Sequence, residues 1–469
     1  MIWIIPYYNR SADKPSSPVI RMHMDTPTSS SIFSFYGQSL DEARPLLTQS
    51  TATSYTRDDS CYDQPVVEHE ERMATASPFS GISNLLNTIL GTGVLAMPAA
   101  VATVGLIPGM VLTLFSGITS GTGLYFLSES AARVQGRHAS FFAVSQLTWP
   151  SAAMWFDTAI AIKCFGVAVS YLIIIGDLLP LVVLAFASEP IADTSLLLDR
   201  RLWILVVMAI LAPLSYLRTL DALRHISALA IVSVIYLCAI VVYHYFTPGL
   251  LPKPEQVDLW HITPGIFSKL PVFIFAFTCH QNIFTVHNEL KDNSRRSMIK
   301  VIFWAIGSAA AVYELVATVG YLSFGRNAKG NIILEYPASP FVAGGRLAIV
   351  ILVMLGYPLQ LHPCRASFSK ILESLNIHPP MKHYTTTTAL VIGTFIIAIS
   401  VSQLDLVLAF VGSTGSTAIS FILPGLFYYK LHQDKPWTCG KTIAVILAAY
   451  GVAIMSVCLT FNIIRLFTE

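Results

Sequence analysis

Three ionisable side chains lie within long apolar stretches of this sequence: Lys163, His280 and Glu314. A charge inside a membrane-spanning segment is costly, so such a residue is a functional candidate. Histidine titrates near neutral pH when its surroundings do not perturb it, and burial shifts the pKa of Lys and carboxyl groups. We therefore expect these three side chains to be candidates for moving protons.

Each of the three also has a structural alternative. Lys163 could pair with Asp157 or another acid, or its ammonium could fill the place of a sodium ion and release a proton. Glu314 could carry protons or neutralise a buried cation. His280 could contact a ligand, carry protons or cap a half-helix.

Two apolar segments are interrupted at their centres. Gly91-Thr92-Gly93 breaks the segment 80–102, and the polar run 278–282 breaks the segment 271–290. A bilayer tolerates unwound backbone only where that backbone lines a cavity. Broken helices at matching positions of two halves indicate a binding site near the membrane midplane, as in secondary transporters. The alternative for the two glycines is close helix packing.

A helix break offers two kinds of binding group. The half-helix that starts there has free N–H groups and a positive dipole end for a carboxylate, and the one that ends there has free carbonyls for an ammonium. Two such breaks suit a zwitterion such as an α-amino acid. The predicted ligand-binding residues are Asn87, Gly91, Thr92, Gly93, Val94, Thr278, Cys279 and His280.

Composition indicates that membrane helices position these residues. The chain is 54% hydrophobic and 12% charged, whereas soluble domains carry about 25% charged residues. Apolar stretches near the length of about 20 residues that spans a bilayer recur after residue 78. We expect an all-α polytopic membrane protein with eleven spans, at about 80–102, 106–130, 153–178, 201–217, 226–246, 266–288, 298–322, 342–363, 385–402, 404–428 and 442–464. The third and eighth could extend to Phe186 and Leu372, and 412–416 interrupts the tenth.

Residues 1–77 differ from the rest of the chain. They are rich in Ser, Thr, Pro and acids and lack apolar periodicity, so we expect a disordered tail ahead of a membrane domain at 78–465. Lys and Arg are more frequent in the loops on the tail's side, which predicts a cytosolic N-terminus. Glu42, Leu46 and Leu47 fit an acidic dileucine motif that a sorting adaptor would read, unless the match is fortuitous.

Several classes of site have no support. The seven Cys have no metal-ligand spacing, and no nucleophile–base constellation indicates an enzyme. A net charge of +2 gives no argument for nucleic acid. We expect no metal, no cofactor and no nucleic-acid partner.

Several motifs resemble the amino acid/auxin permease family. They lie in 84–98, in 163–172 with 176–177, in 279–280 with 287–290, and in 357–360 with Pro363 and Arg365. The resemblance covers about residues 78–465. The chain looks most similar to fungal vacuolar transporters (the Avt group) and neutral amino-acid transporters of animal lysosomes. The resemblance implies a LeuT-type fold of two inverted five-helix repeats plus one helix, and amino-acid transport across a vacuolar or lysosomal membrane.

The residues of the eighth span indicate which ion is coupled to transport. Sodium sites need oxygen ligands, which this fold commonly takes from hydroxyls there, yet residues 346–363 contain no Ser or Thr. We therefore expect proton coupling. Asn87 leaves sodium open, because it matches a family position beside the ion site of sodium-coupled relatives.

The leading hypothesis is a proton-coupled vacuolar or lysosomal transporter of amino acids, preferably neutral ones. The alternatives are an amino-acid sensor that signals through its cytosolic tail and a sodium-coupled plasma-membrane transporter. An ion channel would need a continuous polar pore, and no repeated filter motif is visible.

Overall fold

The computed structural model describes residues 74–187, 195–217, 226–252, 254, 256–377 and 379–468. All of these belong to one compact unit. The tail's dileucine residues, Glu42, Leu46 and Leu47, lie outside the described residues. In the described part the chain is helical, and its one β-bridge, between Ala76 and Leu290, is isolated.

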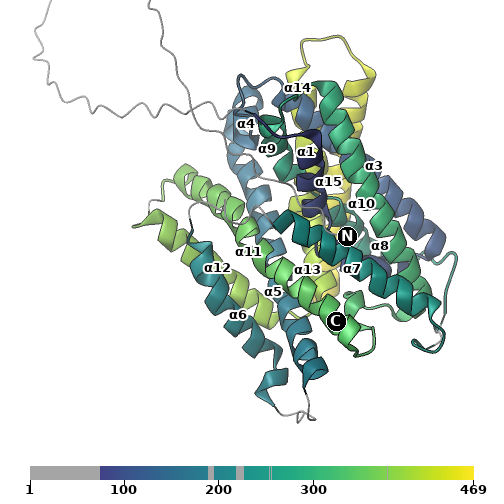
Figure 1. Ribbon diagram of the computed structural model, residues 1–469. Coiled ribbons are helices and arrows are strands. Elements are labelled where there is room, and N and C mark those ends of the chain that lie inside the picture. Colours follow the sequence, from purple (N-terminus) through teal and green to yellow (C-terminus); the bar gives the residue numbers. More distant parts are fainter. Residues whose placement is uncertain are drawn as a thin grey trace, which may run out of the picture. The chain divides into compact units, whose positions relative to one another are not determined.

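The first half contains three short helices, α1, α2 and α4, among longer ones (Figure 1). They are α1 (Pro78–Ile89), α2 (Gly93–Ala102), α3 (Leu106–Ala131), α4 (Phe141–Thr148), α5 (Ala153–Phe186), α6 (Arg200–Ser215) and α7 (Ile226–Phe246). The second half follows with α8 (Ile266–Ala276), η4 (His280–Asn282), α9 (Ile283–Glu289), α10 (Arg295–Phe324), α11 (Pro340–Ser374), α12 (Lys382–Ser400), α13 (Leu404–Val411), η7 (Gly412–Ser416), η8 (Ala418–Ile422), α14 (Leu423–Leu431) and α15 (Cys439–Thr468).

Local sequence signals explain several helix starts. Ser77 caps α1 by accepting a hydrogen bond from the Ser80 amide, and Pro78 occupies the first helical position. Ser140 and Ser339 cap α4 and α11 in the same way. A serine hydroxyl satisfies one of the free N–H groups of the first turn, and proline tolerates that position because it has no N–H to lose.

Each of the eleven expected segments is helical, but not all of them are long enough to count as spans. Eight described helices are long and apolar enough to cross a membrane, and the bent pair α1 and α2 makes up to nine. The remaining two segments are α6, with 16 residues, and the divided pair α8 and α9. The expected count of eleven is therefore not confirmed by length and composition.

Both expected breaks are present. α1 and α2 meet at an angle of 55° across residues 90–92. α8 ends at Ala276, and helical structure resumes at His280. α2 packs against α8, so the broken segments are neighbours, and α10 packs against α1, α2 and α3 around them.

The expected interruption at 412–416 takes a different form. The chain does not unwind there but widens into π-helical turns at η7 and again at η8. Thr417 Oγ1 donates to Gly412 O at 2.6 Å. A Cβ at Gly415 would lie 2.7 Å from both Ala159 O and Lys163 N of α5, so glycine permits a close approach there. π-turns in α-helices are frequent at functional sites.

Candidate functional site

The two helix breaks converge on one side chain of α10, Tyr313. Its buried hydroxyl lies 2.5 Å from Ile89 O and 2.8 Å from Ala276 O. These carbonyls belong to the last residues of α1 and α8, where regular helical bonding stops. Tyr313 therefore joins both breaks to α10. Its hydroxyl binds the carbonyl groups that, from the sequence, we expected to bind a ligand's ammonium.

A small polar cavity lies beside the breaks. Its walls come from α1, the 91–93 turn, α5, α8 and α11, through Thr88, Ile89, Gly91, Thr92, Gly93, Lys163, Val167, Tyr171, Phe275, Thr278 and Gln360. Gly91, Thr92, Gly93 and Thr278 were predicted ligand-binding residues, and Lys163 was a predicted proton group. The structure brings these five together around one space.

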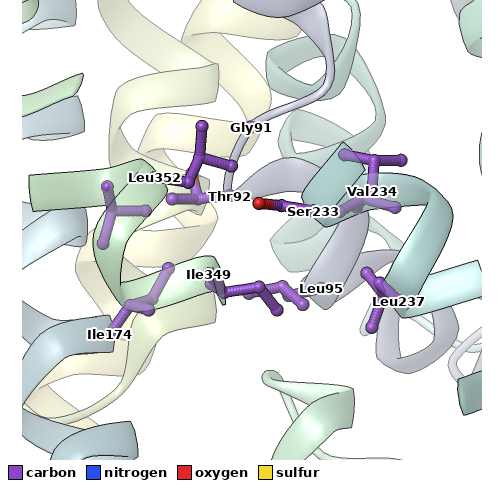
Figure 2. A pocket seen from close by; sticks show the side chains of 11 residues that line it. Gly91, Thr92, Leu95, Ile174, Ser233, Val234, Leu237, Ile349 and Leu352 are labelled. Carbon is purple, nitrogen blue, oxygen red and sulfur yellow. The ribbon is translucent and has the colours of Figure 1, made fainter. Parts of the chain in front are cut away.

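A second cavity, which is largely apolar, shares Gly91 and Thr92 with the first. Figure 2 shows Leu95, Ile174 and Ile349 on one side of it and Ser233, Val234 and Leu237 of α7 on the other. Val94 and Val353 complete the aliphatic lining. The Ser233 hydroxyl donates to Ala348 O at 3.2 Å, so it is already partnered.

Both cavities are small. The apolar cavity has a volume of about 20 Å³ and the polar cavity a volume of about 10 Å³. That is room for about one water each. A ligand larger than water must therefore widen the site.

Thr92 lies between the two cavities, and its hydroxyl is the side-chain group there that is free to bind a ligand. It is the N-cap of α2 but makes no side-chain capping bond. Its hydroxyl is buried with no hydrogen-bond partner among the described residues, and it lines both cavities. A free hydroxyl at a helix N-terminus is suited to bind a carboxylate.

The two glycines of the first break have different roles. The nearest atom to a Cβ on Gly91 would be Tyr171 Oη at 3.9 Å, which is ordinary van der Waals contact, so a Cβ would fit there without a clash. A Cβ on Gly93 would lie 3.0 Å from Ala276 Cα, so Gly93 permits α2 to pack on α8. Neither residue has positive φ. The packing interpretation therefore fits Gly93, and the binding interpretation fits Gly91.

His280 is directed away from both cavities. Nε2 lies 3.1 Å from Ser120 O, and Nδ1 lies 3.1 Å from Ser420 Oγ. Both ring nitrogens are therefore occupied by α3 and η8. Cys279 is buried and lines neither cavity. This arrangement suits anchoring the second break better than binding a ligand.

Among the described residues, Lys163 is buried without a carboxylate partner, and the polar side-chain atoms of Glu314 and Asn87 are buried without hydrogen-bond partners. Lys163 is 2% exposed, and no carboxylate lies within ion-pair distance of it. Asp157 instead accepts a hydrogen bond from Ser367 Oγ at 3.0 Å. Both carboxylate oxygens of Glu314 and both amide atoms of Asn87 lack hydrogen-bond partners. Neither residue lines a cavity.

Sequence reasoning missed Tyr171, Gln360 and Tyr313. Tyr171 follows Lys163 by about two helical turns, so it shares the cavity face of α5. Gln360 is a polar residue in an apolar stretch, which could have marked it. Tyr313 adjoins Glu314, but the sequence has no signal that directs its hydroxyl to the breaks.

At the end where α1 begins, α1 and α9 are neighbours (Figure 1), and backbone hydrogen bonds join the residue before α1's cap to the end of α9. Ala76 N donates to Glu289 O at 3.1 Å, and Lys291 N donates to Ala76 O at 3.0 Å. From the loop between α3 and α4, Arg137 donates to the carbonyls of Asn288, Leu290 and Lys291 at 3.1, 2.7 and 3.3 Å.

At the opposite end, the segment before α8 is hydrogen-bonded to the turn between α2 and α3. Leu106 N donates to Asp258 O at 3.0 Å, and His261 N donates to Val104 O at 2.9 Å. Arg326 Nε lies 2.5 Å from Asp258 Oδ2. This hydrogen bond holds the pKa of the half-buried Asp258 carboxyl below its ordinary value. The ion pair therefore persists below the pH at which a free aspartate becomes protonated.

Comparisons with known proteins agree on one family. The model of the "transmembrane amino acid transporter protein" family matches residues 74–466. The chain is 43% identical to vacuolar amino acid transporter 5 of Schizosaccharomyces pombe, over 83% of this chain and 94% of that one. It is 38% identical to vacuolar amino acid transporter 6 of Saccharomyces cerevisiae, over 82% and 98%. It is 24% identical to solute carrier family 38 member 10 of mouse, over 83% and 36%.

Proposed function

The chain belongs to the transmembrane amino acid transporter family, and we propose that it moves neutral amino acids together with protons across the vacuolar membrane. Its relatives are transporters, not enzymes. The observation that carries the proposal is the pair of cavities that meet at Gly91 and Thr92, one polar and one aliphatic. This pairing matches a zwitterionic head and an apolar side chain.

The carboxylate of the substrate would bind at the start of α2. There the free Thr92 hydroxyl and the positive end of the helix dipole act together. Thr278 of the second break lines the same cavity. The aliphatic wall formed by α2, α5, α7 and α11 would receive the side chain, which supports neutral substrates.

Protons are the coupling ion in this proposal. Lys163 borders the polar cavity without a carboxylate partner among the described residues, and Glu314 is buried without a hydrogen-bond partner. Buried ionisable groups of this kind are candidates for proton relays. The eighth segment, α11, contains no Ser or Thr between residues 346 and 363. The buried, unpartnered amide of Asn87 is the observation that favours sodium instead.

The membrane arrangement completes the proposal. We place eleven spans as two inverted repeats of five plus one, because the two breaks fall in the first and sixth segments. The N-terminal tail would lie in the cytosol, and an acidic vacuolar lumen would drive substrate outward with protons. The vacuolar membrane is proposed because the yeast relatives are named vacuolar transporters.

Uptake into proteoliposomes tests the substrate class. Purified full-length protein would be offered each of the twenty amino acids, with and without an imposed pH gradient. We expect accumulation of neutral amino acids that depends on the gradient. Binding without turnover would favour the sensor, and accumulation of charged amino acids alone would contradict the neutral class.

A further inference from the structure

The inference starts from the Tyr313 hydroxyl, which two carbonyls approach from different broken helices. A phenol has one proton to donate, yet Ile89 O lies 2.5 Å and Ala276 O 2.8 Å from its oxygen. Ile89 O also accepts from Gly91 N at 2.7 Å. The single O–H therefore serves two acceptors at once.

Two carbonyl oxygens directed at one point from two unwound helix ends form an arrangement typical of cation sites. Unwound carbonyls and half-helix C-termini coordinate cations in membrane carriers. Here the oxygen atom of a side chain occupies the point at which they converge. Its proton provides the positive charge density that a cation would otherwise supply.

Packing holds the ring in this position. Tyr313 meets Phe277 edge to face, with ring centroids 5.0 Å apart and planes at 83°. A Cβ on Gly93 would lie 3.5 Å from Tyr313 Oη. Tyr313 is fully buried and lines neither cavity. Its hydroxyl therefore contacts the breaks on the side that faces away from the cavities.

We propose that the Tyr313 hydroxyl occupies the position of a bound monovalent cation and joins the ends of α1 and α8, so that the ligand site is complete without a metal ion. The inference rests on the proposed function only in assuming that the breaks bind the substrate. Tyr313 acts as a positioning residue, because it fixes the backbone that the ligand would contact.

Tyr313→Phe tests the positioning role, and Tyr321→Phe is its matched control. Tyr321 lies on the same helix, and its hydroxyl also bonds backbone, but at Asp258 in a loop. With the amino acid that the panel above shows to be transported fastest, we expect Tyr313→Phe to raise KM about tenfold and to change the maximal rate little. The Ala276 carbonyl would lose its Tyr313 donor, and the Ile89 carbonyl would keep only the Gly91 amide. Tyr321→Phe should leave KM unchanged. An unchanged KM in Tyr313→Phe would overturn the positioning role.

Tyr313→Ser tests the cation position without any transport assay. The shorter hydroxyl leaves space in front of the two carbonyls, so NaCl should raise the melting temperature of purified Tyr313→Ser above its value in choline chloride of equal concentration. The wild type should melt at the same temperature in both salts. Equal melting of the variant, or sodium stabilisation of the wild type, would overturn the inference. If Tyr313→Ser does not fold, Tyr313→Asn takes its place in the same comparison. This readout remains valid even if no amino acid is transported.

Discussion

At the residue scale, the site depends on which atoms of the first break remain free. The Thr92 hydroxyl has no described partner, whereas the Ile89 carbonyl is held by Tyr313. At the first break, the group that could bind an anion is therefore free, whereas the carbonyl that could bind a cation already has a hydrogen-bond donor. Gly91 lines both cavities beside Thr92, and a Cβ there would come no closer than 3.9 Å to its nearest neighbour.

Gly91→Val should abolish transport in a protein that still folds and reaches its membrane. Its added methyl groups would occupy the space that the two cavities share. Gly93→Val should instead lower stability, because even a Cβ there lies 3.0 Å from Ala276 Cα. Initial uptake and melting temperature of both variants check this contrast. Normal uptake by a correctly localised Gly91→Val protein would refute the binding role.

Glu314→Gln should flatten the pH dependence of flux more than it weakens substrate binding. The substitution keeps the shape but removes the titrating group, whose two oxygens are buried without hydrogen-bond partners. Lys163→Ala should act in the same direction. The measurement is initial uptake across a series of external pH values. Glu129→Gln, at the ion pair with Arg295, serves as control, and a pH profile unchanged from wild type in both test variants would exclude them as proton groups.

Residue patterns in the sequence indicated part of this site. The glycines within an apolar segment indicated Gly91, and the charge within a membrane segment indicated Lys163. Both residues border the polar cavity. His280 carried the same kind of signal, but its ring nitrogens bond to α3 and η8. Side-chain direction depends on packing between distant helices, which is why neither this outcome nor the role of Tyr313 could be predicted.

At the element scale, the breaks are held by neighbouring helices and by a set of hydrogen bonds at the end where α1 begins. Arg137 and the Ala76 bridge bind α9, the loop before α4 and the start of α1 into one closed group. A charged donor bonded to carbonyl groups contributes about 1.5–3 kcal/mol. We expect these hydrogen bonds to break when this end of the site opens.

Arg137→Ala should therefore favour the state that is open at this end. A cysteine introduced at Thr88, which lines the polar cavity, should react with a polar thiol reagent about tenfold faster in the Arg137→Ala background. Arg133→Ala is the matched control, because Arg133 lies in the same loop but contacts His432. Equal reaction rates in the two backgrounds would show that Arg137 does not hold the site closed.

Apolar periodicity located the helices within a few residues, because each segment must satisfy its own backbone in a bilayer. It also located both breaks. It did not predict that residues 412–416 stay helical as π-turns, since this depends on the close packing of Gly415 against α5. Nor could it settle the span count, because α6 is shorter than a typical span.

At the scale of the whole molecule, the destination of the protein is predicted to depend on its tail. Replacing Leu46 and Leu47 with Ala should shift a fluorescent fusion from the vacuole to the plasma membrane, because the acidic dileucine pattern would no longer be read by an adaptor. Microscopy of the double variant beside a Thr48→Ala control checks this. Vacuolar fluorescence in both would mean that the motif does not act as the sorting signal.

The most direct test of the whole account compares two driving forces in proteoliposomes that contain the wild-type protein. One sample has a pH gradient and no sodium, and the other has a sodium gradient at equal pH. The account predicts that the pH gradient alone drives accumulation of a neutral amino acid. Lys163 borders the polar cavity, and Glu314, whose carboxylate oxygens are buried, lies on α10 beside the breaks. Accumulation driven only by the sodium gradient would contradict it and would make Asn87 the leading ion ligand.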